Sequence, residues 1–81
     1  MDKGVVSVKL YNDTYVLRTS APEEQVLKVA QEVNRRMQQL AEKKNVQQRD
    51  KLAVWTALDL AADLQELQQR YERLLDAVRE R

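Results

Sequence analysis

The stretch LDLAADLQELQQRYERLLDAV, residues 58–78, decides the fold of this 81-residue chain. It carries an apolar side chain at every third or fourth position, at Leu60, Leu64, Leu67, Tyr71, Leu74 and Val78. This spacing predicts a coiled-coil helix, and we call these six residues the heptad seam. Leu75 lies beside the seam and widens its apolar face enough for four helices to share it. We therefore expect a homodimer at least, with a homotetramer as an alternative and the relative direction of the helices left open.

The composition excludes several classes of protein. The chain has no Cys and no His, so disulfides and the usual zinc and transition-metal sites are excluded. Its formal charge of +1 falls well short of the basic excess of a typical nucleic-acid binder. No apolar run approaches the ~20 residues of a membrane-spanning helix, and residues 1–13 lack the apolar core of a signal peptide. We expect a cytoplasmic protein without a cofactor, a metal, or a nucleic-acid or membrane partner.

The N-terminal residues predict a β-hairpin. Apolar and polar residues alternate over residues 5–11 and again over residues 14–18, which is the period of half-buried strands. The side chains expected to face inward are Val6, Val8, Leu10, Tyr15 and Leu17. Asn12 and Asp13 lie between the strands and tolerate positive φ, so they are the expected two-residue turn.

A first helix is expected to begin within SAPE, residues 20–23. Ser20 and Glu23 have the spacing of a capping box, and Pro22 lies in the first turn, where its missing N–H costs nothing. The apolar stripe that follows reaches about Lys44. The opposite face carries the pairs Glu24–Lys28 and Glu32–Arg36, each four residues apart, which are interpreted as solvated surface.

A second helix is expected after a connection at residues 45–49, with Asp50 as its cap. No Gly or Pro interrupts residues 51–81, which predicts a rod of roughly 45 Å. Residues 52–62 are apolar on most faces, and we expect the hairpin and the first helix to cover this segment as far as Leu60.

The expected fold class is α+β, in the order strand, strand, helix, helix. Residues 1–62 form a small α/β head, and residues 63–81 form a coiled-coil extension that continues the second helix. Because the hairpin and the first helix are both expected to pack on the start of the second helix, no element of the same chain is left to cover the seam. We therefore expect the seam to pack on another chain.

Three segments resemble the ZapA family of bacterial division-ring proteins. They are VKLYNDTYVLR (residues 8–18), VAQEVNRRMQQLAEK (residues 29–43) in a Pro-initiated helix, and DKLAVWTALDLAADLQEL (residues 50–67), which leads into the heptad tail. The resemblance covers nearly the whole chain from Val5 onward. It implies dimers that can join through their coils into antiparallel tetramers. It also implies a cell-division protein at mid-cell that binds the tubulin-like GTPase FtsZ, cross-links its protofilaments and promotes Z-ring assembly and stability.

The FtsZ-facing surface implied by the resemblance is charged and lies on the head. Its candidates here are Lys43, Lys44, Arg49 and Asp50, with Arg35 and Arg36 as weaker ones. The implied partner is acidic, so a basic patch suits it, although these charges also fit a merely solvated helix face. The candidate oligomer interface consists of the heptad seam and Trp55. Trp55 has an equal alternative as a core residue of the head.

Three classes of function compete. An enzyme is excluded because the chain has no His, no Cys and no Gly-rich phosphate loop, and no small-molecule substrate is expected. Asp59 and Asp63 lack the further oxygen ligands of a cation site, so capping or interface hydrogen bonding is the favoured role for them. A coiled-coil dimer acting as a nucleic-acid-binding or general adaptor protein is the alternative, but the alternating charges of the tail largely cancel attraction to phosphate. We interpret the chain as a structural protein that bridges FtsZ filaments as a two-headed oligomeric rod.

Overall fold

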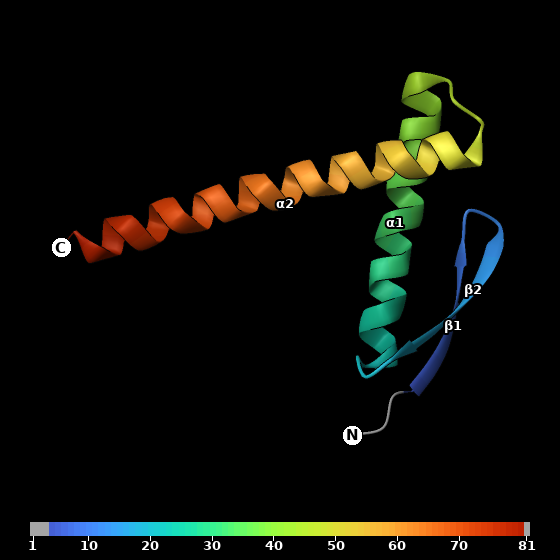
Figure 1. The fold of residues 1–81 in the computed structure, drawn as a ribbon, viewed down its shortest axis with the longest axis horizontal. Helices are drawn as coiled ribbons and strands as arrows, with labels where there is room; N and C mark the ends of the chain where they lie inside the picture. Colours follow the sequence, from blue (N-terminus) through green and yellow to red (C-terminus); the bar gives the residue numbers. More distant parts are fainter. Residues whose placement is uncertain (1–3, 81) are drawn as a thin grey trace.

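A computed structural model describes residues 4–80 as a β-hairpin followed by two helices. The elements are β1 (Gly4–Leu10), β2 (Asp13–Thr19), α1 (Glu23–Lys44) and α2 (Arg49–Arg79). The hairpin lies alongside α1, and α2 crosses α1 at a steep angle and projects far beyond it (Figure 1). The expected α+β class and element order are confirmed. The predicted boundary between head and coiled-coil extension falls within the uninterrupted α2 helix and stays a prediction.

The register of the hairpin explains which strand residues face inward. Val6 pairs with Leu17 and Val8 pairs with Tyr15, and directly opposed residues of antiparallel strands lie on the same face. Val6 and Val8 are buried where β1 packs on α1, as expected. Tyr15 and Leu17 share that face but remain exposed. The inner face of the hairpin is therefore only half covered by α1.

The hairpin turn lies one residue earlier than predicted. Leu10 pairs with Asp13, so the turn residues are Tyr11 and Asn12 rather than Asn12 and Asp13. Both have positive φ, 50° and 74°, as a two-residue type I′ turn requires. The Asn34 side chain on α1 accepts the Tyr11 backbone N–H at 2.7 Å. This tertiary contact holds an aromatic residue at a turn position where local preference alone favours Asn, Asp or Gly.

The predicted capping box at the start of α1 is wrong. The helix begins at Glu23 with Pro22 as its N-cap, which has φ −60° and makes no side-chain cap hydrogen bond. Pro22 enters the helix without strain because its ring holds φ near this value. Ser20 lies outside the cap, and the Thr19 hydroxyl instead accepts the Ala21 N–H at 3.0 Å. A side chain of the preceding strand thus directs the chain into α1.

The first helix ends at Lys44, as predicted. Asn45 follows in the left-handed conformation, with φ 54°, and the Val46 N–H donates to the Ala41 carbonyl at 3.2 Å. This is the hydrogen bond of a Schellman motif, which satisfies a carbonyl at the end of the helix. It turns the chain sharply toward α2.

The predicted capping role of Asp50 is also wrong. The second helix begins at Arg49 with Gln48 as its N-cap, and the cap makes no side-chain hydrogen bond. The Leu52 N–H already donates to the Gln48 carbonyl at 2.9 Å. Asp50 therefore lies inside the first turn, where its negative charge faces the positive end of the helix dipole.

The core is small and lies where α1 meets its neighbours. Its buried members are Val6, Val8, Met37, Leu52 and Thr56. The buried Thr56 hydroxyl donates to the Leu52 carbonyl at 2.8 Å, so its polar group is satisfied. In residues 4–80, no helix is long and apolar enough to cross a membrane.

The expected cover over the start of α2 is incomplete. Within residues 4–80, α2 packs mainly on α1. The hairpin meets it at the Arg49–Asp13 ion pair and lines one hollow beside it, so the hairpin covers this segment only in part. The steep crossing buries Leu52 and Thr56 alone (Figure 1). The large apolar side chains left exposed are Val54 at 61%, Trp55 at 41% and Leu58 at 58%. This segment carries more apolar surface than its own chain covers.

Candidate partner-binding surfaces

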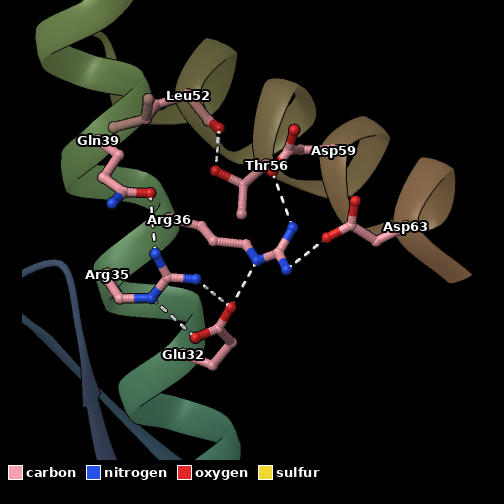
Figure 2. A network of polar contacts seen from close by, with 8 residues as sticks. All are labelled: Glu32, Arg35, Arg36, Gln39, Leu52, Thr56, Asp59 and Asp63. Carbon is pink, nitrogen blue, oxygen red and sulfur yellow. Dashed lines mark hydrogen bonds and ion pairs between the residues drawn. The ribbon is translucent and has the colours of Figure 1, made fainter.

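Arg36 joins α1 to α2 (Figure 2). Its guanidinium donates to Glu32 on its own helix at 2.7 Å, and to Asp59 at 2.9 Å and Asp63 at 2.5 Å on α2. The side chain is only 17% exposed, less than any of its carboxylate partners. Hydrogen bonds to Glu32 and then Asp63 raise the pKa of Arg36 above its usual range, so it stays charged. We call Arg36 with these three carboxylates the interhelix brace.

The brace also explains why the carboxylate of Glu32 stays ionised. Hydrogen bonds from Arg35 and then from Arg36 lower the pKa of Glu32 from 4.5 to about 2. Arg35 donates to both carboxylate oxygens of Glu32, at 2.9 and 2.5 Å, and to Gln39 at 3.0 Å. Arg35 is half exposed at the outer edge of the brace.

The brace accounts for Asp59 and Asp63, which lie one turn apart on α2. Each pairs with Arg36 of the same chain, which is neither the helix cap nor the interface hydrogen bond favoured for them on sequence grounds. Among the described residues, no three His, Cys, Asp or Glu side chains form a group that could hold a metal ion. The sequence did not reveal that Asp59 and Asp63 pair with Arg36, because both lie more than 20 positions from it in the chain. Arg36 therefore joins the two helices within the chain, and the interpretation of the Glu32–Arg36 pair as solvated surface is wrong.

The four stronger FtsZ candidates lie where α1 turns into α2. Lys43 and Lys44 are the last residues of α1, and Arg49 and Asp50 are the first residues of α2. We call these four residues the corner. All four are exposed, and a connection of only four residues, 45–48, holds the two pairs together.

Two residues of the corner are positioned by contacts within the chain. Arg49 forms an ion pair with Asp13 at the start of β2, which ties the hairpin to the first turn of α2. The Lys44 ammonium lies 4.1 Å from the centroid of the Trp55 ring, a cation–π contact. The sequence revealed neither contact, since both depend on how the elements pack.

The heptad seam is exposed along the projecting part of α2. Leu64, Leu67, Tyr71, Leu74 and Val78 have exposed fractions of 58–66%. Leu60, at the head end of the seam, is half buried and lines an apolar cavity. Within residues 4–80 no other element covers the distal five side chains (Figure 1).

Two apolar hollows lie side by side on the head. The first has a volume of about 280 Å³ and opens between the hairpin end, α1 and the start of α2. The second, of about 240 Å³, lies between the hairpin and the first half of α1. Leu10 and Val33 line both hollows, which we together call the head groove. Neither hollow gathers the convergent polar groups of a catalytic site.

Comparison with known proteins agrees with this fold. The family model described as cell division protein ZapA matches residues 6–81. Among solved structures, the chain is similar to a ZapA mutant dimer from Geobacillus stearothermophilus, with 29% sequence identity and a TM-score of 0.77. That similarity covers 98% of this chain and 92% of the other. No curated protein matches the sequence. The fold, the exposed seam and a family match over nearly the whole chain lead to one conclusion: the chain belongs to the ZapA family of cell division proteins, which are not enzymes.

Proposed function

We propose that this protein binds FtsZ and cross-links its protofilaments as an oligomer whose heads are separated by α2. Family membership supports FtsZ as the partner. The observation that carries the bridging role is the exposed heptad seam on a helix of 31 residues, which extends well beyond the head. An apolar stripe of this length is stable in water when a second copy covers it.

The dimer is the first step of this assembly. The similar solved structure is itself a dimer, which supports the same state for this chain. We further propose that two dimers join in antiparallel fashion through the distal part of α2, so that heads lie at both ends of the rod. Leu75, beside the seam, gives each helix a second apolar edge for a four-helix contact. A rod with heads at both ends holds two filaments together, and multivalency strengthens weak individual contacts.

We place the FtsZ contact on the corner, with Arg35 as an outlying member. The three cations of the corner are exposed on one side of the head, and they suit an acidic partner. Arg36 is excluded from this surface because its side chain is only 17% exposed and lies within the brace, whereas the side chains of Arg35 and Arg49 are about half exposed. The site of action is then the mid-cell division ring in the cytoplasm.

Sedimentation equilibrium over a wide concentration range, followed by pelleting of the same samples with polymerised FtsZ, tests the proposal. We expect a dimer that associates to a tetramer, with bundles pelleting where the tetramer is populated. Bundling at concentrations where only dimer exists would contradict the two-ended rod. Failure to pellet with single filaments at any concentration would contradict FtsZ binding, whatever the oligomeric state.

A further inference from the structure

Trp55 is the one tryptophan of the chain, and it lies outside the core of the described residues. Its side chain is 41% exposed, whereas the residues of α2 that are buried on α1 are Leu52 and Thr56. Aromatic side chains bury the largest apolar areas in interfaces, and tryptophan is enriched among the residues that contribute most to binding. An exposed tryptophan on the head is therefore a candidate contact residue for a partner.

The heptad seam does not reach Trp55. Each residue advances about 100° around an α-helix, which places Trp55 roughly 140° from the centre of the seam. A copy of the chain that binds along the seam therefore leaves this ring uncovered.

Trp55 lies directly against the corner. The Lys44 ammonium is 4.1 Å from the centroid of the ring, so the end of α1 touches the second turn of α2 here. Lys51 lies one turn before Trp55 on α2 and is also exposed. Asp59 lies one turn after it, and its carboxylate is already paired with Arg36. The ring is thus bordered by two exposed cations, and the carboxylate on its other side is neutralised within the chain.

An exposed aromatic ring with cations at its border has the composition of a binding hot spot. The ring supplies apolar contact area, and the charges at the rim orient the partner. The cation–π contact also holds Lys44 beside the ring, so a partner meets both groups together. The complementary surface is an apolar side chain with carboxylates next to it. A second copy does not offer this surface, because pairing the two rings would bring Lys44 and Lys51 of both chains together.

We propose that Trp55 is a contact residue for FtsZ, which places an apolar side chain on the ring and carboxylates beside Lys44 and Lys51. This inference rests on the proposed function. It assigns Trp55 to the partner surface in place of the oligomer interface, and it extends that surface from the corner along the outer side of α2.

Trp55→Ala tests the assignment. We expect the protein concentration needed for half-maximal pelleting with FtsZ filaments to rise at least ~10-fold, because a central aromatic contact is lost. The dimer dissociation constant from sedimentation equilibrium and the helical circular dichroism should stay unchanged. Trp55→Phe, which keeps an aromatic ring, should retain most of the binding. The matched control is Val16→Ala, which removes an equally accessible apolar side chain, 67% exposed, from the hairpin and should pellet like wild type.

The outcomes separate this inference from the proposed function. Unchanged pelleting of Trp55→Ala would overturn the inference while FtsZ binding through the corner still stands. A weakened dimer in Trp55→Ala would also overturn it, in favour of the oligomer interface. If wild type itself fails to pellet with filaments, the proposed function is wrong and the inference falls with it.

A spectroscopic measurement observes the contact without removing the side chain. Since the chain has one tryptophan, replacing it with a hydroxylated tryptophan analogue gives a single fluorophore that can be excited apart from any tryptophan of FtsZ. We expect quenching by acrylamide to fall when FtsZ filaments are added. Dilution that separates the dimer should leave the quenching unchanged. Quenching that FtsZ does not alter, or that changes with dimer dissociation, would contradict a contact between Trp55 and FtsZ.

Discussion

The side chain of Asn34 holds the backbone of Tyr11 in the hairpin turn. Its Oδ1 accepts the Tyr11 N–H at 2.7 Å, and its Nδ2 donates to the carbonyl of Lys9 at 2.6 Å. The oxygen and the nitrogen of one side-chain amide thus satisfy two backbone groups at the turn, beside Tyr11 with its φ of 50°. An aromatic residue in this conformation is unfavourable in isolation. The α1 helix therefore determines where the hairpin turns.

Asn34→Ala should lower the stability of the protein by about 1–2 kcal/mol, because the Tyr11 N–H and the Lys9 carbonyl lose their partner. Thermal and urea unfolding at a fixed protein concentration measure the effect, since oligomerisation makes stability depend on concentration. Gln31→Ala, an exposed position on the same helix, is the control. A loss no larger than that of the control would show that the turn holds without Asn34.

Arg36→Gln should lower the melting temperature more than Arg35→Gln. Arg36 forms the ion pairs between α1 and α2 seen in residues 4–80, and its loss leaves Glu32, Asp59 and Asp63 close together without a bridging cation. Among residues 4–80, Arg35 hydrogen-bonds to residues of α1 alone. Added salt should reduce the difference, because it screens the repulsion among partly exposed carboxylates. Equal melting temperatures at low salt would mean that the brace does not stabilise the helix crossing.

The brace should also impose a pH dependence on stability. The folded-state pKa of Glu32 is depressed to about 2 from 4.5, so its contribution is fully present above about pH 4.5 and is lost as the pH falls through 2. Urea unfolding of wild type and Glu32→Gln measures this, since the other carboxylates are common to both. We expect wild type to be the more stable above pH 5, with the difference disappearing toward pH 2. A difference independent of pH would contradict the depressed pKa.

Leu67→Glu with Leu74→Glu should abolish oligomers, because it places charges in the middle of the heptad seam. Analytical ultracentrifugation should show a monomer or an unfolded chain in place of a dimer. Gln65→Glu with Gln69→Glu adds the same charge on the other side of the helix and should leave the mass unchanged. Identical masses for the two variants would exclude the seam as the interface.

Reversing the cations of the corner, Lys43→Glu with Lys44→Glu and Arg49→Glu, should abolish co-sedimentation with FtsZ filaments while the oligomer persists. The matched variant reverses three cations elsewhere on the head, Lys9, Arg18 and Lys28, which are also exposed. It should still pellet with filaments. The opposite result, with binding lost only in the second variant, would move the FtsZ contact to the hairpin and the first half of α1.

Local patterns in the sequence determined the order of elements, the inner face of the strands, the end of α1 and the heptad seam. Each of these features depends on the spacing of apolar residues along one helix or strand. That spacing is visible in a single local segment of the sequence. The same periodicity showed that residues 52–62 have apolar side chains on most faces. It could not show which of these side chains a single chain would bury.

Tertiary structure decided the rest. The turn moved to Tyr11 and Asn12 because Asn34, 23 positions away, bonds the backbone there. Arg36 lies in a brace because a steep crossing brings it to Asp59 and Asp63, and the same crossing leaves Val54, Trp55 and Leu58 exposed. Such contacts join residues far apart in the chain. Their energies depend on the angle and distance between elements, and no local pattern of residues encodes these quantities.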